Sequence, residues 1–493
     1  MRVTNHMIYG NSMNNIWRNA RHLNNLVTQI ETGKRIQRPS DDPLIAARSL
    51  RYRTILSEAE QFSRNVQQGM AWMDVSESAF NNILTGSPTN PSLMQRIYER
   101  LVQGAQTGTQ EIADQLAILT EMRQFFDQMF NVDMNQTYLG RYVFSGFHTN
   151  QPPVLKQDWP DRSFVIQQSF QPSSIETAKT FHRATPTSLP QDMWMNVIKL
   201  PFTNVDFGFD TAGVVAGAPL PQVGVFLADG TELFVENFIS TEENAYRPQG
   251  DFYIHHIVDT GELVMSDALR ARIEATGGLN IVYEKNDLRA GELNPIVYFD
   301  SFEIVGDESR AFSTAGQNIQ MEISPMSYIT INSHARDILT AELFADMRRL
   351  FEFADTLVPS DPGVIRDYFR NPPHSRSGDD LENAVLQFLS DEKAAFSGMM
   401  HIRMNNMLEA IMIHSTQAQR EHTNLGSRMA RMEMVGIRLE EDEVAYTDLL
   451  SQNEDTDLAS TIMRKNGAEA AFGHALMAIA RTTQLSLADF INR

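Results

Sequence analysis

The chain has 493 residues, which is more than one hydrophobic core usually holds, so two or three domains are expected. Its 41 basic and 62 acidic residues give a formal net charge of −21, which would repel the phosphate backbone of a nucleic acid. The absence of cysteine excludes disulfides, zinc–thiolate sites and thiol catalysis. We therefore expect neither a nucleic-acid partner nor a cysteine-dependent activity.

The sequence also argues against membrane insertion. No apolar run reaches the ~18 residues that a membrane-spanning helix needs. Residues 1–30 lack the continuous apolar core of a cleavable secretory signal. We expect neither a membrane span nor an ordinary secretory route.

Apolar side chains near the amino terminus recur at alternating steps of four and three residues, which places them on one narrow seam of a helix. A second seam near the carboxyl terminus has the same spacing and falters at a glycine and a glutamate. A single amphipathic helix cannot bury its seam alone, so we expect the two ends to pack against each other as the interface of a rod. Periodicity alone leaves an ordinary helical bundle core open as the alternative. The seams consist of Tyr9, Met13, Ile16, Ala20, Leu23, Val27 and Ile30, and of Leu425, Met429, Met432, Gly436, Leu439, Glu443, Tyr446 and Leu450.

Proline divides the chain into three parts, because it is rare in helix interiors. Twelve of the 20 prolines lie between Pro152 and Pro325, and none follows Pro373. The middle reads as strands, with Asp229-Gly230 as a strong hairpin signal. We predict an α+β fold: an elongated, discontinuous helical bundle or coiled-coil rod from residues 1–150 and 336–493, with an inserted antiparallel β-rich domain at 151–335. The expected strands are Val223–Phe226, Glu232–Val235, Phe252–Val258, Leu279–Tyr283, Ile296–Phe299 and Ile329–Ile331, followed by a helix at Ile338–Leu357 and a loop at Val358–Ser377.

A polar motif follows the first predicted helix. Gly33 in Thr32-Gly33-Lys34-Arg35 can end that helix, and the aspartate of Asp42-Pro43 suits the N-cap of the next. The pair Asp41-Asp42 invites a metal or catalytic interpretation, but capping already accounts for it. Near the other end, Asp455 and Asp457 are expected to cap a helix that begins near Leu458.

Several motifs in this order resemble those of bacterial flagellins, and more narrowly those of the proteins at the flagellar hook–filament junction. The resemblance covers about 150 residues at the front and about 90 at the back, and leaves the middle uncovered. The insert is larger than junction proteins usually carry, whereas the ending Asp489-Phe490-Ile491-Asn492-Arg493 favours a junction protein over a filament flagellin. The motifs are Met1 to Thr4; Gly33, Lys34 and Arg35; Pro39, Ser40, Asp41, Asp42 and Pro43; Gly140 to Gly146 with Arg141, Phe144, Ser145 and Gly146; and Leu449 to Leu487 with short gaps.

The resemblance implies a structural adaptor of the flagellum, exported through the flagellar type III channel and located outside the cell, or in the periplasm if the flagellum is internal. Its implied partners are copies of itself in a ring, a hook-side junction protein and filament flagellin. Two alternatives stay open, namely a filament flagellin and an unrelated helical adhesin whose β insert binds a ligand.

The far carboxyl segment carries a discontinuous apolar stripe that suits a helix-in-groove partner. The resemblance implies an export chaperone as that partner, and packing on the first helix is the simpler alternative. The stripe consists of Leu458, Ile462, Phe472, Leu476, Ile479 and Leu487.

Signals for enzymatic chemistry are weak. The acid run Glu440–Glu443 lacks the ligand spacing of a calcium loop, and His255-His256 lies in a predicted strand, where neighbouring side chains point to opposite faces. There is no His-Glu-x-x-His, phosphate loop, nucleophile elbow or dinucleotide motif. A glycosidase has no positive support, so we expect a non-enzyme without a cofactor.

Overall fold

The computed structural model describes residues 5–87, 89–106, 112–182, 191–208, 216–242, 244–306, 308–357, 359–372 and 374–491. The chain forms two compact units. Unit 1 contains residues 1–67, 322–328 and 432–493, and unit 2 contains residues 68–321 and 329–431. The helices α2 (Pro43–Phe80) and α10 (Gly378–Glu454) contribute residues to both units.

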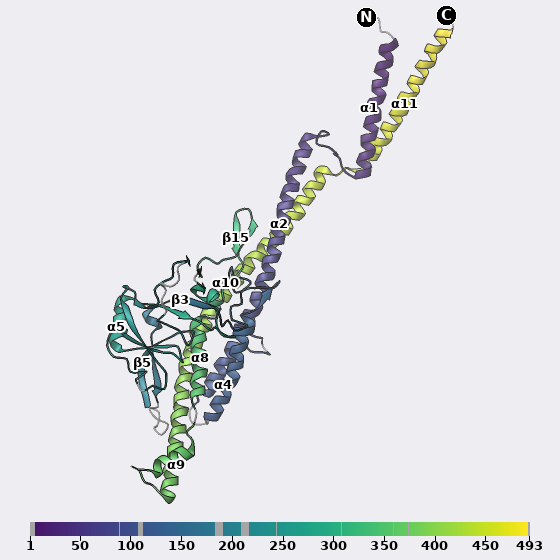
Figure 1. Ribbon diagram of the computed structural model, residues 1–493. Helices are drawn as coiled ribbons and strands as arrows, with labels where there is room; N and C mark the ends of the chain where they lie inside the picture. The colour runs from purple at the N-terminus through teal and green to yellow at the C-terminus, as the bar shows by residue number, and fades with distance from the viewer. Residues whose placement is uncertain are drawn as a thin grey trace. The chain divides into compact units, whose positions relative to one another are not determined.

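Unit 1 is built from two helix pairs. In one pair, α1 (Asn5–Thr32) packs along α11 (Leu458–Ile491), as Figure 1 shows at the two chain ends. In the other pair, the first part of α2 lies against the last part of α10, where the rings of Tyr52 and Tyr446 have centroids 6.4 Å apart. A side-chain amide of α2 also donates to the short hairpin in this unit, with Asn65 Nδ2 2.8 Å from the Glu322 carbonyl oxygen. Both ends of the chain therefore contribute to one unit.

Unit 2 has a helical core next to the sheet. Its buried residues include an aromatic cluster in which Phe126 and Phe130 meet Phe344 and Phe351, with ring centroids 4.6 to 5.6 Å apart. This cluster joins α4 and η2 to α8, because those elements carry the four rings. The further helical elements are η1 (Asn81–Thr85), α3 (Leu93–Gly104), α4 (Ile112–Asp127), η2 (Gln128–Asp133), α5 (Asp267–Thr276), α6 (Pro295–Tyr298), α7 (Ala335–Ile338), α8 (Ala341–Thr356) and α9 (Pro362–Arg370), with a short 3-10 turn η3 (Pro172–Ser174).

Within the described residues, the insert contains an 11-stranded sheet of order β4-β5-β10-β9-β8-β7-β11-β3-β12-β13-β6. Most neighbours are antiparallel, and the β8–β9 and β13–β6 pairs are parallel. The first strand, β3, lies between β11 and β12, so strands from the start and the end of the insert pair with each other. The strands are β3 Ser163–Phe170, β4 Glu176–His182, β5 Gln191–Lys199, β6 Ala216–Gly217, β7 Gly224–Leu227, β8 Glu232–Phe238, β9 Tyr253–Ile257, β10 Glu262–Met265, β11 Leu279–Lys285, β12 Asp300–Val305 and β13 Glu308–Phe312.

Two small hairpins flank this sheet in the chain. One consists of β1 (Thr137–Tyr138) and β2 (Arg141–Tyr142), and the other of β14 (Gln320–Ser324) and β15 (Ser327–Thr330). Every strand in the described part of the chain therefore lies between residues 137 and 330, and long helices lie toward both ends of the chain. The predicted α+β class with helical termini is confirmed, whereas the exact division at residues 150 and 335 stays a prediction.

Most strand predictions are confirmed, and two local ones are wrong. The hairpin at Asp229-Gly230 joins β7 to β8, with Gly230 at φ +88°, where a side chain would be strained. The segment Ile296–Phe299 was expected as a strand, but it lies mostly in α6, because Asn294 caps a helix that has Pro295 as its first residue. The expected loop 358–377 contains α9, which begins at Pro362 with Asp361 as its N-cap.

In the part of the chain that the structure describes, no helix combines the length and the apolar character that a membrane crossing would require.

The aromatic cluster of unit 2 gives a stability prediction. Phe130→Ala should lower the free energy of unfolding by about 3–5 kcal/mol, because Phe130 is fully buried and its ring packs edge-on against Phe344. Val132→Ala is the matched control on η2 and should change stability by less than about 0.5 kcal/mol, because Val132 is 59% exposed. Urea unfolding followed by circular dichroism measures both variants, and equal losses would contradict a core role for the cluster.

Candidate functional site

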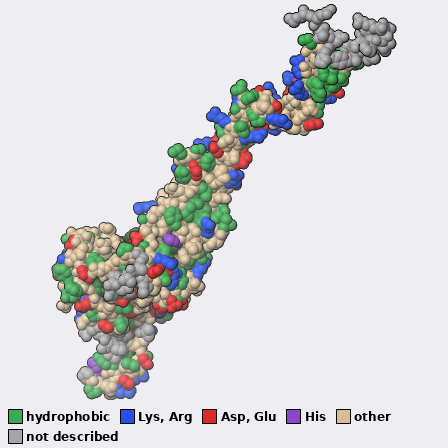
Figure 2. All heavy atoms as spheres, turned by 45° about the horizontal axis from the view of Figure 1, so that its top comes forward, with side chains coloured by type: hydrophobic (Ala, Val, Ile, Leu, Met, Phe, Trp, Pro, Cys, Tyr) green, Lys and Arg blue, Asp and Glu red, His purple; other side chains and the backbone are tan. Residues whose placement is uncertain are grey.

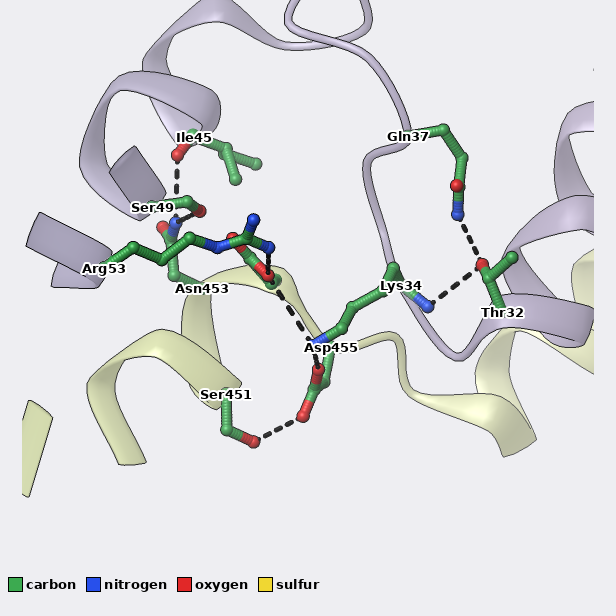
Figure 3. A network of polar contacts seen from close by, with 10 residues as sticks. Thr32, Lys34, Gln37, Ile45, Ser49, Arg53, Ser451, Asn453 and Asp455 are labelled. Carbon is green, nitrogen blue, oxygen red and sulfur yellow. Dashed lines mark hydrogen bonds and ion pairs between the residues drawn. The ribbon is translucent and has the colours of Figure 1, made fainter. Parts of the chain in front are cut away.

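Two chain connections meet in unit 1, and we call them together the joint: residues 33–42, which join α1 to α2, and residues 455–457, which join α10 to α11. Their backbones pair directly. The Arg35 amide donates to the Glu454 carbonyl oxygen at 2.6 Å, and the Thr456 amide donates to the Gly33 carbonyl oxygen at 2.9 Å. The joint therefore fixes the two helix pairs at the same point (Figure 3). Its two connecting segments are more than 400 residues apart in sequence.

Charged side chains reinforce the joint. Lys34 Nζ lies 2.6 Å from Asp455 Oδ1 and 3.6 Å from Glu454 Oε2. Arg53, on α2, places its guanidinium 2.7 Å from the same Glu454 oxygen. The Glu454 side chain is only 5% exposed, whereas Lys34 is 42% exposed, so Glu454 is the most buried of these four charged residues.

These contacts shift the ionisation of the joint. The hydrogen bond between Lys34 and Asp455 raises the pKa of Lys34 and lowers the pKa of Asp455. Burial by itself would raise the pKa of Glu454, but hydrogen bonds from Arg53 and Ser49 and the nearby positive charges hold it below 4.5. Both carboxylates are therefore ionised and paired at neutral pH.

Uncharged contacts close the other side of the joint. Asn453 Nδ2 donates to the Ile45 carbonyl oxygen at 3.0 Å and to Ser49 Oγ at 2.7 Å, so the end of α10 is tied to the first turns of α2. Ser451 Oγ donates to Asp455 at 2.5 Å. The Asn453 side chain thus holds the end of α10 to α2, and Ser451 contacts the same carboxylate that binds Lys34 (Figure 3).

The polar motif after α1 builds the turn of the joint. Gly33 ends α1 at φ +69°, and Asp42 Oδ1 accepts hydrogen bonds from the amides of Leu44 and Ile45, so the predicted helix end and N-cap are confirmed. Asp41 accepts from the amides of Gln37 and Arg38, and these bonds lower the pKa of its carboxyl. The two aspartates therefore serve the backbone, which leaves little basis for the metal interpretation. Pro39 and Ser40 are exposed, and Arg35 is exposed beside its paired backbone.

The two carboxyl-side aspartates have different roles. Asp457 caps α11, because its Oδ1 accepts from the Ser460 amide at 3.2 Å, as predicted. The expectation that Asp455 also caps this helix is wrong, since its carboxylate binds Lys34 and Ser451 instead. A cap could be foreseen from local spacing, whereas an ion pair to a residue 421 positions away could not.

The second sequence motif lies in unit 2, at the corner where the chain enters the insert. Phe144 is fully buried and packs edge-on against Phe80 at 6.2 Å, and Ser145 Oγ donates to the Gln151 carbonyl oxygen at 2.6 Å. Gly146 adopts φ +58°, and Arg141 is exposed in β2. The motif is thus a structural corner, with Arg141 as its exposed member.

The carboxyl-side seam is buried as its heptad spacing predicts. Leu425, Met432 and Leu439, each seven residues apart, are fully buried. The helix in contact with them is α2, not the first helix, because α10 and α2 share contacts such as His422 with Glu77 at 3.0 Å. The expected pairing of this seam with the first seam is therefore wrong: α1 packs on α11. The other seam positions are half-buried: Met429, Gly436, Glu443, Tyr446 and Leu450.

On α1, the buried face includes most of the predicted seam and one residue beside it. Ile16, Leu23, Val27 and Ile30 are half-buried, whereas Met13 is 49% exposed. Leu26, which the seam did not include, is the most buried α1 side chain that the structure describes. A second heptad through Ile16, Asn19, Leu23, Leu26 and Ile30 was the signal that could have found it. The Tyr9 side chain lies outside the described residues.

The carboxyl-terminal stripe is split between two faces of α11. Phe472 and Ile479 are half-buried, but Leu458, Ile462 and Leu476 are exposed. The Leu487 side chain lies outside the described residues. We call the exposed apolar side chains of α1 and α11 together the terminal apolar surface, and hydrophobic side chains are visible at this end of the molecule in Figure 2. Its members are Met7, Met13, Trp17, Leu458, Ile462, Met463, Leu476 and Met477.

The two sequence segments that build unit 1 carry opposite charge. Residues 1–67 contain ten basic and five acidic residues, whereas residues 432–493 contain five basic and eleven acidic ones. The acid run Glu440–Glu443 lies in the second segment, with Glu440 and Glu441 exposed. Opposite charges favour the association of the two ends, in keeping with the ion pairs of the joint.

The adjacent histidines of the insert bind different partners. His255 Nδ1 lies 3.0 Å from the Ala245 carbonyl oxygen, and His256 Nδ1 lies 2.8 Å from Asn237 Oδ1. Burial lowers the pKa of His256 to about 4. Across the described ranges, no group of three or more His, Asp or Glu side chains is placed to hold a metal ion. The two imidazoles thus have separate partners within the insert.

Parts of this chain are similar to known proteins. Residues 3–149 match the family described as the bacterial flagellin N-terminal helical region. The chain is 28% identical over 159 residues to the flagellar hook-associated protein 3 of Salmonella typhimurium, covering 31% of this chain and 46% of that protein. It is 25% identical over 147 residues to the flagellin of Bacillus subtilis, covering 30% and 46% respectively. The chain thus spans about half the length of the curated relatives that it matches.

Among solved structures, the flagellar junction protein FlgL from Legionella pneumophila is similar to 84% of this chain over its whole length. The sequence identity is 12% and the TM-score is 0.29, and a likeness at this level carries no argument about function.

The joint yields a mutational prediction. Glu454→Gln should accelerate hydrogen exchange of the Arg35 and Thr456 amides more than Lys34→Met does, because Glu454 is buried and Lys34 is half-exposed. For Lys34→Met an increase of about twofold to fivefold is expected, as for other exposed ion pairs. Lys465→Met, which removes an exposed pair with Glu469 on α11, is the control and should leave both amides unchanged. Equal exchange in wild type and Glu454→Gln would show that the network does not hold the joint.

The joint should also respond to acid. Glu454 and Asp455 have pKa values below their usual 4.5 and 3.8, so their stabilisation is present above those values and is lost as the pH falls through the lowered ones. Protection of the Arg35 and Thr456 amides, corrected for the intrinsic exchange rate, should therefore fall below about pH 4. In Glu454→Gln this fall should be smaller, and an identical acid profile in both proteins would rule out Glu454 as the titrating group.

Proposed function

Because the chain belongs to the bacterial flagellin family, we propose that it is a structural subunit of the bacterial flagellum that acts as an adaptor at the hook–filament junction. The observation that carries the proposal is the match of residues 3–149 to the flagellin helical region. The hook-associated relatives favour the junction over the filament. In this role the protein performs no reaction, and it works by binding its neighbours.

The terminal apolar surface supplies the contacts for assembly. Subunits of a tubular helical lattice meet through heterologous contacts, so one face of each copy must fit a different face of the next. Trp17 and Ile462 are 60% and 45% exposed, although both are large apolar residues. Covering such a half-exposed side chain with a neighbouring subunit is worth about 1 kcal/mol, and eight of them together make assembly favourable.

The joint gives the adaptor a fixed geometry. Backbone hydrogen bonds at Arg35 and Thr456 and the Glu454 network hold the α1–α11 pair to the start of the α2–α10 pair. An adaptor has to present one surface to the hook and another to the filament. The network supports this role because it fixes both helix pairs of unit 1 at one crossing.

The proposed partners are further copies of this chain in a ring, a hook-side junction protein and filament flagellin, outside the cell or in the periplasm if the flagellum is internal. We further propose that the chain is exported through the flagellar type III channel, and that an export chaperone binds the apolar stripe of α11. Leu458, Ile462 and Leu476 are exposed and therefore open to such a partner, whereas Phe472 is half-buried. A chaperone that takes the whole stripe would displace α1, which would keep the subunit from assembling early.

A filament flagellin is the second candidate, because the Bacillus subtilis flagellin matches nearly the same length of chain. Immunogold electron microscopy of intact flagella, with an antibody against residues 163–312, separates the candidates. We expect one band at the boundary of hook and filament. Label along the whole filament would replace the junction role by the filament role, and absence of flagellar label would contradict both.

The terminal apolar surface gives an assembly prediction. Ile462→Asp should leave the monomer folded, because Ile462 is 45% exposed, but it should prevent incorporation into flagella by burying a charge at the subunit contact. Asn466→Asp adds the same charge to an exposed polar position of α11 and should assemble normally. Circular dichroism of the monomer and the band count in electron micrographs measure the two effects. Normal incorporation of Ile462→Asp would exclude this surface from the contact.

The seams give a second assembly test. Leu23→Asp or Ile30→Asp would place a charge in the half-buried face of α1 and should weaken the α1–α11 pair by a few kcal/mol. Unlike Ile462→Asp, these variants should lose helical signal in the monomer as well as assembly. A fully helical Leu23→Asp monomer that assembles would contradict the paired-terminus arrangement.

A further inference from the structure

A cleft of about 580 Å³ lies in unit 2 between the β4–β5 edge of the sheet and the helices α8 and α10. Figure 1 shows β5, α8 and α10 in this part of the molecule. About half of its lining is apolar, with Val197 and Ile198 from β5, Leu350 from α8 and Met407 from α10. Its size is in the range of small-molecule sites. Nothing in the proposed adaptor role uses it.

Two arginines form the floor of this cleft, Arg349 on α8 and Arg403 on α10. Arg403 is only 9% exposed, and its Nε has no hydrogen-bond partner. Its guanidinium lies 5.1 Å from the centroid of the Phe353 ring, which covers one face of the group. Among the residues that the structure describes, no carboxylate is within ion-pair distance of Arg403.

Arg349 is paired but not saturated. It forms a buried ion pair with Glu262, yet both of its terminal nitrogens are buried without a hydrogen-bond partner. Burial, followed by the positive charge of Arg349, lowers the pKa of Arg403 to about 10. Glu262 pairs with Arg349 and not with Arg403, so the floor carries uncompensated positive charge.

The other charged groups at the cleft are already committed or lie at its rim. Lys199 is paired with Asp346 and, at 2.6 Å, with Glu176, and His414 lies 3.7 Å from Asp346. Glu342 and Glu409 are exposed where the cleft opens. The positive floor thus attracts an anionic group, whereas the acidic rim disfavours a ligand with several negative charges.

We propose that this cleft binds a small organic monoanion, with its carboxylate against the N–H edges of Arg403 and Arg349 and its apolar body along β5 and Met407. A planar carboxylate matches the fork of guanidinium donors better than a round ion does. Such a ligand would supply the acceptors that the two side chains lack and would neutralise the charge that they share. The site is separate from the assembly surfaces of unit 1 and does not depend on the adaptor role.

The test is isothermal titration of the full chain with sodium benzoate at constant ionic strength. Saturable binding is expected, at least tenfold tighter than for benzamide, which has the same shape without the charge. Arg403→Met should weaken benzoate binding at least tenfold, and the control Arg366→Met, which removes an exposed arginine paired with Glu382, should not.

Arg403→Met also separates a ligand-binding role from a purely structural one. Without ligand, the variant should melt at the same or a higher temperature than wild type, because an unpaired buried charge is removed. If it does not fold, Arg403→Lys keeps the charge but loses the planar fork, and weaker benzoate binding by this variant is then the expected result. The proposal would be overturned if benzoate did not bind saturably, or if it bound equally to wild type and both Arg403 variants. Benzoate would then be an adventitious additive only.

Discussion

The central constraint on this molecule is that neither terminal helix can bury its apolar face alone. The solution is a closure between residues that are far apart in sequence, where the Arg35 amide meets the Glu454 carbonyl and Thr456 meets Gly33. Closing a loop of more than 400 residues costs entropy, and each doubling of loop length adds about 0.6 kcal/mol. The charged network around Glu454 and the opposite charge of the two chain ends offset that cost at the point of closure.

Helix caps and the burial of heptad positions could be predicted from the sequence, because both depend on residues that are close together in the chain. The spacing of Leu425, Met432 and Leu439 foretold their burial, and Asp42 and Asp457 cap the helices that follow them. Periodicity does not name a partner, however, because any apolar seam fits several helices. For that reason α1 was expected to pair with the seam of α10, whereas its partner in the structure is α11. The predicted seam omitted Leu26, because Leu26 and Val27 belong to two overlapping heptads of the same helix.

Features that depend on distant residues could not be predicted from one sequence. The ion pairs of Lys34 with Asp455 and of Arg349 with Glu262 arise only when separate elements meet. In α6 the local signal was present, since Asn294 and Pro295 form a cap and a first helical residue, but the apolar run after them favoured a strand. Local and tertiary signals competed there, and the local cap prevailed.

The position of β3 in the sheet sets an order in which the insert can form. The first strand of the insert lies between β11 and β12, whose residues come more than 100 positions later. A chain delivered from its amino end, as during synthesis on a ribosome, therefore holds β3 without any neighbour until residue 285 has emerged, and without its second neighbour until residue 305. Its exposed backbone edges must stay unpaired for that interval, so slow delivery would favour misassociation over folding. The sheet order thus makes the speed of chain delivery a determinant of yield.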